Sequence, residues 1–211
     1  MDFSIGIITS GTVPQNIISS IVKQNIPNFE ILIIGGTNIY HESYITHIPF
    51  DEKKGAGWIT RKKNLITKNA KYDNIVYMHD YYQLESEWYN GFKLIENDWD
   101  VCMTKIINLD NTRFRDWCVW DDPTLCYPNG KHRIILTNYT YNKIKYMYIS
   151  GGYWIAKKIF MLANPLDESL RWGESEDVEW SLRIRDKFKY VMNINSTVKT
   201  IKQKKLSASI L

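Results

Sequence analysis

A histidine and an aspartate follow directly on a short apolar run in the first half of the chain. Residues 74–78 (NIVYM) are β-branched, apolar or aromatic, which predicts a buried strand ending at His79-Asp80. In open α/β sheets, ligands bind beyond the carboxyl ends of the strands. An aspartate there can hold a divalent cation that bridges two phosphates, and Mn²⁺ also accepts imidazole. The alternative, which these two residues leave open, is that Asp80 caps the next turn and His79 packs against it.

Positively charged residues and two glycines precede this strand. The cations are Lys53, Lys54, Arg61, Lys62 and Lys63, and the glycines are Gly55 and Gly57. Glycine lets a backbone approach a phosphate, a helix N-terminus offers N–H groups, and arginine can bind two oxygens at once. We therefore single out Arg61 as a phosphate-binding residue and expect the lysines to divide between site and solvent. The alternative is a solvated helix face, the usual place of a lysine and arginine run.

A group of carboxylates lies nearer the C-terminus, within residues 171–177 (RWGESED). They fall in the first turn of a predicted helix, where the helix dipole favours negative charge, so capping alone explains them. Trp172-Gly173, just before the turn, offers an aromatic platform and a close backbone approach. A carboxylate held ionised beside them can take a proton from a hydroxyl nucleophile.

The predicted elements bring these groups to one sheet. The first half reads as strand 3–9, a helix after Pro14, strand 29–34, a short strand at 45–48, a helix from about residue 57 and the strand at 74–78. Such a unit joins parallel strands by right-handed crossovers. The second half reads as helix 85–97, strand 101–108, a long loop at 109–133, strands at 134–136 and 146–149, a turn at 150–154, helices 157–163 and 174–187, and strand 190–198. Residues 199–211 read as a basic tail or a linker to a further domain.

The composition is that of a globular protein. Of the 211 residues, 44% are hydrophobic and 24% are charged, which argues against disorder. The net charge of +4 suits a phosphate-bearing ligand but lacks the concentrated stripe of a nucleic-acid-binding protein. The 14 Tyr and 8 Trp residues could line a carbohydrate site, although filling the core explains them equally simply.

The cysteines and the apolar segments bear on location. Cys102, Cys118 and Cys126 are odd in number and lack metal-type spacing, so we expect reduced thiols. The first ten residues carry an acid where a signal peptide needs basic residues, and no segment is long enough to span a bilayer. We expect a soluble, cytoplasmic protein (in the host cytoplasm if it is viral).

The order of these motifs resembles that of GT-A-fold nucleotide-sugar glycosyltransferases, with the inverting family-two enzymes as the nearest comparison. The βαβαβ unit, Arg61-x-x-Asn64, His79-Asp80, Gly151-Gly152 and Glu176-Asp177 follow one another over roughly residues 3 to 190. The joint order is more specific than any one motif. The segments GWITRKKNLI (57–66) and VYMHDYY (76–82) are similar to the corresponding segments of viral and bacterial members of this family. Among the viral ones, the chain resembles the N-terminal domain of chlorovirus multidomain glycosyltransferases that modify the major capsid protein.

The resemblance implies a fold and its boundaries. The fold would be α/β, a GT-A fold with a Rossmann-like, open, twisted and mostly parallel sheet flanked by helices. A single domain would cover residues 1–198, with a nucleotide-sugar-binding half at 1–105 and an acceptor-binding half at 106–198. Residues 199–211 would be a tail or linker, and further domains could follow.

The resemblance also implies the residues that bind the donor. They are Thr9, Ser10, Gly11, Gly35, Gly36, Arg61, His79, Asp80 and Gly152. Gly35 and Gly36 stand where many members have an acidic pair that reads the base, so the base stays open. His79-Asp80-Tyr81 stands at the Asp-x-Asp metal motif, with His for the first Asp and Tyr for the second. Asp80, with His79 as a second ligand, would hold Mn²⁺ or Mg²⁺ against the donor diphosphate, assisted by Arg61.

On the acceptor side the resemblance implies binding by Trp154, Trp172 and Gly173. Asp177, or failing that Glu176, matches the catalytic base that deprotonates an acceptor hydroxyl. The hydroxyl would displace the nucleoside diphosphate at the anomeric carbon with inversion. We expect a hexose or deoxyhexose donor, with UDP-glucose as the default. The acceptor would be a glycan or a glycoprotein, with a viral capsid protein among those considered.

The long loop at 109–133 contains Arg113, Arg115, Trp117 and Trp120. Long loops in compact domains are often functional, so it is either an acceptor-binding wall or a surface excursion without ligand contacts.

Two other classes compete with a transferase. A nucleotide-sugar- or carbohydrate-binding module without catalysis would explain the missing Asp-x-Asp. A sugar-nucleotide nucleotidyltransferase would normally have a cation in the loop after the first strand, and residues 10–14 (SGTVP) have none.

Overall fold

The computed structural model describes residues 1–38, 40–53, 55–125, 134–205 and 209–210. Up to residue 107 the elements are β1 (Phe3–Ile8), α1 (Gln15–Val22), β2 (Phe29–Ile34), β3 (Ile45–Ile48), α2 (Ile59–Asn69), β4 (Asn74–His79), β5 (Tyr82–Leu84), α3 (Trp88–Phe92) and β6 (Val101–Ile107). They are followed by β7 (Cys118–Val119), β8 (Ile135–Leu136), the 3₁₀ helix η1 (Ile144–Tyr146), β9 (Met147–Tyr148), β10 (Tyr153–Lys157), α4 (Lys158–Ala163), α5 (Glu176–Ile184), β11 (Tyr190–Thr200) and β12 (Ser209–Ile210).

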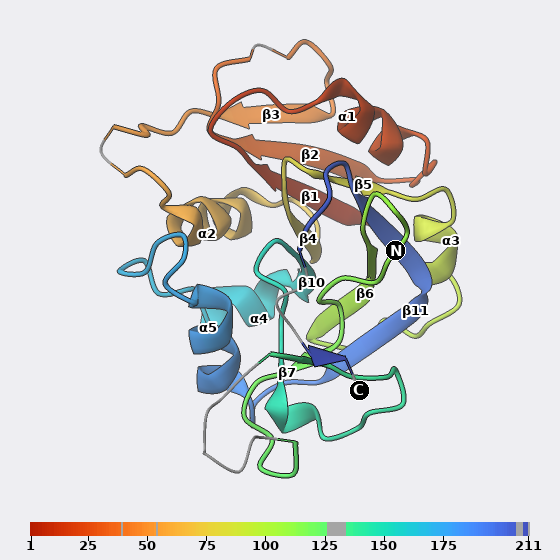
Figure 1. Ribbon diagram of the computed structural model, residues 1–211. Coiled ribbons are helices and arrows are strands. Elements are labelled where there is room, and N and C mark those ends of the chain that lie inside the picture. The colour runs from red at the N-terminus through yellow and green to blue at the C-terminus, as the bar shows by residue number, and fades with distance from the viewer. Residues whose placement is uncertain (39, 54, 126–133, 206–208, 211) are drawn as a thin grey trace.

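The described strands form one large and one small sheet (Figure 1). The eight-stranded sheet has the order β3-β2-β1-β4-β10-β6-β11-β5, and the four-stranded sheet has the order β12-β8-β7-β9. In the large sheet β3, β2, β1 and β4 are mutually parallel, as are β6 and β11, whereas β10 and β5 run antiparallel to their neighbours. The predicted α/β class with a mostly parallel sheet is confirmed. Because β10 lies between β4 and β6, the halves 1–105 and 106–198 share one sheet.

Helices cover both faces of the large sheet, as the contacts of β1 illustrate. Alternate residues of a strand point to opposite faces. Phe3 packs edge-on against Trp88 of α3, with ring centroids 5.2 Å apart. On the other face Gly6 lies under α2, where an added Cβ would come within 2.3 Å of Ile66. All six residues of β1 are therefore buried, as expected for a central strand covered on both sides.

The strand register gathers the predicted site at one edge of the sheet. Ile8 at the end of β1 pairs with both Ile34 of β2 and His79 of β4. The residues that follow these strands must therefore lie side by side. β10 enters the same edge from the opposite direction, and the His79 backbone N–H donates to Gly152 O at 3.0 Å. The carboxyl edge predicted from the apolar runs is the edge observed.

Three predicted boundaries are wrong. The helix predicted at 85–97 is only the five-residue α3, because Gly91 is a poor helix former and lies against β11, where a Cβ would meet Ser196 Oγ at 2.3 Å. The turn predicted at 150–154 includes the start of β10, a strand that the sequence interpretation missed. The tail predicted from residue 199 begins too early, since Lys199 and Thr200 pair with β5 and β12 pairs with β8.

Two of the predicted thiols, Cys102 and Cys118, are free and buried. The third, Cys126, lies outside the described residues, as does Lys54 of the basic group. Among the helices that the structure describes, none is long and apolar enough to cross a membrane.

Candidate active site

The cations of α2 point in different directions. Lys62 and Lys63 are buried, whereas the side chain of Arg61 is 48% exposed. Lys62 Nζ donates to Thr9 O at 2.7 Å and pairs with Glu52. Arg61 turns away from the sheet edge and pairs with Glu168, with 3.4 Å between Nη1 and Oε2. The assignment of Arg61 to the diphosphate is therefore corrected, because its guanidinium lies outside the cavity described below.

Lys63 is the buried contact that joins three parts of the site. Its Nζ donates to Gly151 O at 2.7 Å and to Glu176 Oε1 at 3.1 Å. It also lies 4.7 Å from the centroid of the Trp154 ring. Burial lowers the pKa of Lys63, while the negative charge of Glu176 opposes that shift. This one ammonium group therefore ties α2 to the Gly151-Gly152 turn and to the start of α5.

A second set of contacts places the loop that precedes α5. Asn64 Nδ2 donates to Leu166 O at 2.9 Å, and the Leu166 N–H donates back to Asn64 Oδ1 at 3.1 Å. Further along, the Trp172 N–H donates to Gly57 O at 2.8 Å. These contacts hold Trp172 against the start of α2, with its side chain 74% exposed.

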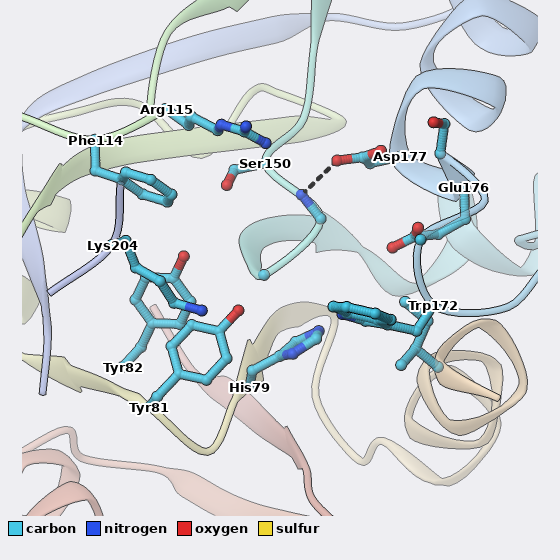
Figure 2. A pocket seen from close by; sticks show the side chains of 15 residues that line it. His79, Tyr81, Tyr82, Phe114, Arg115, Ser150, Trp172, Glu176, Asp177 and Lys204 are labelled. Carbon is cyan, nitrogen blue, oxygen red and sulfur yellow. Dashed lines mark hydrogen bonds between the residues drawn. The ribbon is translucent and has the colours of Figure 1, made fainter. Parts of the chain in front are cut away.

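The sheet edge opens into a cavity of about 330 Å³ (Figure 2). Glu176, Asp177 and Trp172 lie on one side, and Arg115 and Lys204 lie on the other. A smaller hollow of about 200 Å³ adjoins it, and its lining includes Thr9, Ser10 and Asp80. His79 and Trp172 line both spaces. Together they form a two-part site whose parts share His79 and Trp172 as lining residues.

The carboxyl pair is held by backbone and by Lys63. The Gly151 N–H donates to Asp177 Oδ2 at 3.0 Å, and the Val178 N–H donates to Asp177 Oδ1 at 2.9 Å. Burial raises the pKa of Asp177, the neighbouring charge of Glu176 raises it further, and Lys63 partly offsets both effects. Glu176 is the member paired with Lys63. Asp177 has no such cation partner among the described residues, and it lines the cavity.

The glycine pair permits this approach. A Cβ on Gly151 would lie 2.9 Å from both Asp177 Oδ2 and Glu176 Oε1. A Cβ on Gly152 would lie 2.9 Å from the hydroxyl oxygens of Tyr81 and Tyr82. Both distances are too short for a real side chain, so the turn requires glycine in order to pass between the carboxylates and the tyrosines.

His79 and Asp80 have the chemistry of a cation site. Asp80 Oδ2 accepts a hydrogen bond from Thr9 Oγ1 at 2.6 Å. His79 Nε2 is buried and has no hydrogen-bond partner among the described residues. Burial, followed by the charges of Lys63, Lys204, Lys62 and Lys202, holds the pKa of His79 well below its ordinary value, so the imidazole is neutral. A neutral imidazole and one carboxylate fit a divalent cation that takes its other ligands from phosphates and water.

That fit is limited to two protein ligands. Within the described ranges no group of three or more His, Cys, Asp and Glu side chains is arranged to hold a metal ion.

The structure brings most of the predicted site residues together. Those lining the two spaces are Thr9, Ser10, His79, Asp80, Gly152, Trp172, Gly173, Glu176 and Asp177. Gly35 and Gly36 lie beside the hollow with φ of +89° and +74°, and a Cβ on Gly36 would meet Gly11 O at 2.2 Å. The backbone conformation therefore explains this glycine pair.

Trp154 is a correction. It lies within β10, only 1% exposed, and stacks on Tyr77 with ring centroids 4.7 Å apart. Its ring has no surface left for an acceptor, because a residue at this position of a central strand points into the core.

The long loop contributes part of the cavity wall. Phe114 and Arg115 line the cavity, whereas Trp117 is buried in the core. Residues 126–133 of the loop lie outside the described part of the chain. Whether the loop binds an acceptor stays a prediction.

Sequence reasoning missed Lys63, Tyr81, Tyr82 and Lys204 as site residues. For Lys63 a signal existed: Ile59, Lys62, Lys63 and Ile66 share the i, i+3, i+4, i+7 spacing of one helix face. Lys204 carried no such signal, because it lies in a segment without periodicity.

The architecture described above is the GT-A fold. A 13% identical structure, S. aureus TarS 1–349, superposes with a TM-score of 0.64 over 93% of this chain and 60% of its own. GalNAc-T7 with UDP, GalNAc and Mn²⁺ is 15% identical, with a TM-score of 0.64 over 98% of this chain and 44% of its own. TarS 1–349 in complex with UDP-GlcNAc is 13% identical and gives a TM-score of 0.65 over 97% of this chain and 60% of its own.

The predicted GT-A fold is confirmed by these glycosyltransferase structures. The chain spans three-fifths or less of the length of these neighbours. In sequence comparisons no protein-family model and no curated protein matches the chain.

We predict that Lys63→Met lowers the free energy of unfolding by about 3–5 kcal/mol, because it leaves Glu176 buried without its cation. Lys68→Met is the matched control, since Lys68 is exposed on the same helix, and its effect should stay within about 0.5 kcal/mol. Urea denaturation followed by tryptophan fluorescence measures both. Equal stability of the two variants would contradict the role given to Lys63.

Proposed function

We propose that the chain is a nucleotide-sugar glycosyltransferase. It transfers a hexose or deoxyhexose, with UDP-glucose as the default donor, to a hydroxyl of a glycan or glycoprotein. Transfer inverts the anomeric carbon and uses Asp177 as the base. One observation carries the proposal: a carboxylate with a raised pKa faces the same cavity as the neutral His79 beside Asp80. The proposal is supported by the GT-A fold and by neighbours crystallised with UDP, UDP-GlcNAc and Mn²⁺.

The two parts of the site suit the two substrates. The hollow at Thr9, Ser10 and Asp80 would take the nucleotide and bring its phosphates to His79. The cavity beyond would take the sugar and the acceptor, beside Asp177. Trp172 lies where the two spaces meet, and its exposed ring offers a flat apolar surface for the C–H face of a sugar. That a viral capsid protein is the acceptor stays a prediction.

Asp177 is a better general base than Glu176. Transfer requires a group that is ionised at the working pH and yet basic enough to take a hydroxyl proton in the transition state. Glu176 is engaged in the buried ion pair with Lys63, with 3.1 Å between Nζ and Oε1, so taking a substrate proton would disrupt that pair. Asp177 accepts two backbone N–H groups, which orient its carboxyl group, while its raised pKa keeps it basic.

Asp80, with His79 as a second ligand, would hold Mn²⁺ or Mg²⁺. When bound, that cation would supply positive charge to the leaving diphosphate. Thr9 orients the Asp80 carboxyl group through its hydroxyl. Burial and four nearby lysines keep His79 neutral, so its nitrogen can act as a ligand.

The proposal is tested by incubating the intact protein with a panel of nucleotide sugars, Mn²⁺ and candidate sugar acceptors. We expect one donor to release its nucleoside diphosphate, and the acceptor to accelerate that release. A protein that is stabilised by a nucleotide sugar in a thermal-shift assay, yet never releases nucleoside diphosphate, is instead a non-catalytic binding module. That outcome would overturn the proposed transfer.

We predict that Asp177→Asn lowers kcat by about 10²- to 10⁴-fold, because the amide cannot accept the acceptor proton. The affinity for the nucleoside diphosphate should be unchanged, as measured by isothermal titration calorimetry. Asp186→Asn is the matched control on an exposed aspartate and should transfer sugar normally. Near-normal transfer by Asp177→Asn would move the base to Glu176 or elsewhere.

The pH dependence gives a second prediction. Asp177 accepts a proton only when ionised, so kcat/KM falls as the pH falls through its pKa, which lies above the ordinary value of about 3.9. Glu176→Gln removes the repelling charge and leaves Lys63 acting on Asp177, so the acid limb should move to lower pH. Glu179→Gln, on the same helix, is the control and should leave the limb in place. An acid limb that moves to higher pH in Glu176→Gln, or not at all, would contradict Asp177 as the base.

We further predict that Asp80→Ala abolishes the gain in nucleoside diphosphate affinity that Mn²⁺ provides, a loss of at least about tenfold. Calorimetric titrations with Mn²⁺ and with EDTA measure that gain. Asp186→Ala should retain it in full. The assignment of Asp80 as a ligand would be refuted by an unchanged Mn²⁺ dependence.

A further inference from the structure

Two cations line the wall of the cavity opposite the carboxyl pair. Figure 2 shows Arg115 and Lys204 on this side, beside Phe114 and Tyr81. Arg115 comes from the loop after β6, and Lys204 comes from the segment after β11. They are far apart in the sequence, and the fold brings them to one wall.

The side chain of Asn108 holds the backbone of Lys204 in place through two hydrogen bonds. Asn108, only 2% exposed, accepts from the Lys204 N–H through Oδ1 at 2.9 Å and donates through Nδ2 to Lys204 O at 3.1 Å. The Ile201 N–H donates to Tyr81 O at 2.9 Å. The Lys204 ammonium lies 3.8 Å from the centroid of the Tyr81 ring. Residues 201–205 thus form a strap across the site.

Arg115 is held by a strained but firmly anchored loop. Its φ of +25° lies in the left-handed region, which costs a non-glycine residue free energy and occurs mainly where the surroundings enforce it. The hydrogen bonds of the next residue, Asp116, hold the backbone of Arg115 in this conformation. Asp116 Oδ2 accepts from the Ile106 N–H at 3.2 Å and from Tyr139 Oη at 2.7 Å. Asp116 Oδ1 accepts from Arg113 Nε at 2.7 Å. The strained backbone conformation is therefore maintained at Arg115, a residue that lines the cavity.

The positive charges gathered here repel one another. The pKa of Lys204 is lowered first by burial and then by Lys202, and Arg115 lowers it as well, while Asp80 alone raises it. Like charges on one partly desolvated wall are unfavourable, and a bound anion would offset part of that repulsion. The influence of Asp80 on Lys204 also shows that the ammonium lies within electrostatic reach of the proposed phosphate position.

We propose that Arg115 and Lys204 form a clamp for the diphosphate of the donor. The inference rests on the proposed function, since it assigns the phosphate contacts of that same site. An arginine and a lysine that line the same cavity offer several N–H donors to two phosphate groups. His79-Asp80-Tyr81 supplies one carboxylate for a cation, where an Asp-x-Asp motif supplies two. Positively charged side chains of the protein, Arg115 and Lys204, would therefore neutralise a larger part of the diphosphate charge. Within the strap that follows β11, Lys204 is then part of the donor site.

The clamp is tested by calorimetry with inorganic pyrophosphate and with UDP, on the intact protein, in EDTA and in Mn²⁺. We expect Lys204→Ala and Arg115→Ala each to weaken binding about tenfold or more, the loss of one charge-assisted contact. Lys205→Ala removes the same charge from an exposed position of the same strap and should bind like the wild type. Thermal melts of each variant verify that it is folded.

Asn108→Ala separates position from charge. Asn108 acts by holding the Lys204 backbone, so its loss should weaken pyrophosphate binding although the net charge is unchanged. In the Asn108→Ala background, Lys204→Ala should cost much less than it does in the wild type. A purely structural role of Asn108 would instead lower the melting temperature and leave pyrophosphate affinity unchanged.

The outcomes distinguish failure of the proposed clamp from failure of the proposed transferase activity. If the wild type binds pyrophosphate or UDP and both cation variants bind equally well, the clamp is refuted. If the cation variants lose binding while no nucleotide sugar is ever turned over, the clamp holds and the transferase proposal fails. If the wild type binds neither pyrophosphate nor UDP in either condition, both are overturned.

Discussion

The site depends on the burial of one ammonium group. Lys63 Nζ contacts Gly151 O and Glu176 Oε1, and so joins helix α2, the turn before β10 and helix α5. Burying a charge is costly unless it is paired and hydrogen-bonded, and Lys63 meets that condition only when all three parts are in place. The position of Asp177, the proposed base, is in this way linked to the packing of the sheet. A shift of α5 would separate Lys63 from Glu176 and leave each buried charge without its ionic partner.

In the same arrangement, negatively and positively charged side chains line different parts of the cavity. The acids lie at the start of α5, whereas His79, Arg115 and Lys204, to which we assign the diphosphate together with Asp80, line the cavity away from them. Lys63 pairs with Glu176, and the negative charge of Glu176 in turn raises the pKa of Asp177. The two adjacent carboxylates therefore differ: one sustains the buried ion pair, and the other, the proposed base, faces the cavity.

Much of the fold was predictable, because buried parallel strands leave apolar runs in the sequence. The runs of β1, β2 and β4 gave the sheet edge, and the edge gave His79 and Asp80. The strand β10 was missed because its short run follows two glycines, which favour a turn. Only its pairing with β4 and β6 decides that it is a strand.

Individual side chains were harder to assign. Three consecutive cations lie on α2, and the ability of arginine to bind two oxygens favours Arg61 as the phosphate ligand. The helix phase set by Ile59 and Ile66 nevertheless turns Arg61 outward. Lys204 reaches the cavity through contacts with Asn108, nearly a hundred residues away, and local sequence carries no trace of such a contact. The sheet edge follows from local patterns, whereas the cation wall follows from tertiary contacts.

A crystal structure of the protein with an intact nucleotide sugar would show where the diphosphate and the reacting sugar carbon lie. We predict that the diphosphate lies beside Asp80 and His79, within hydrogen-bond reach of Lys204 and Arg115. The anomeric carbon should then face the part of the cavity that Asp177 lines. A nucleotide sugar bound beside Arg61, or with its anomeric carbon turned away from Asp177, would refute the proposed site.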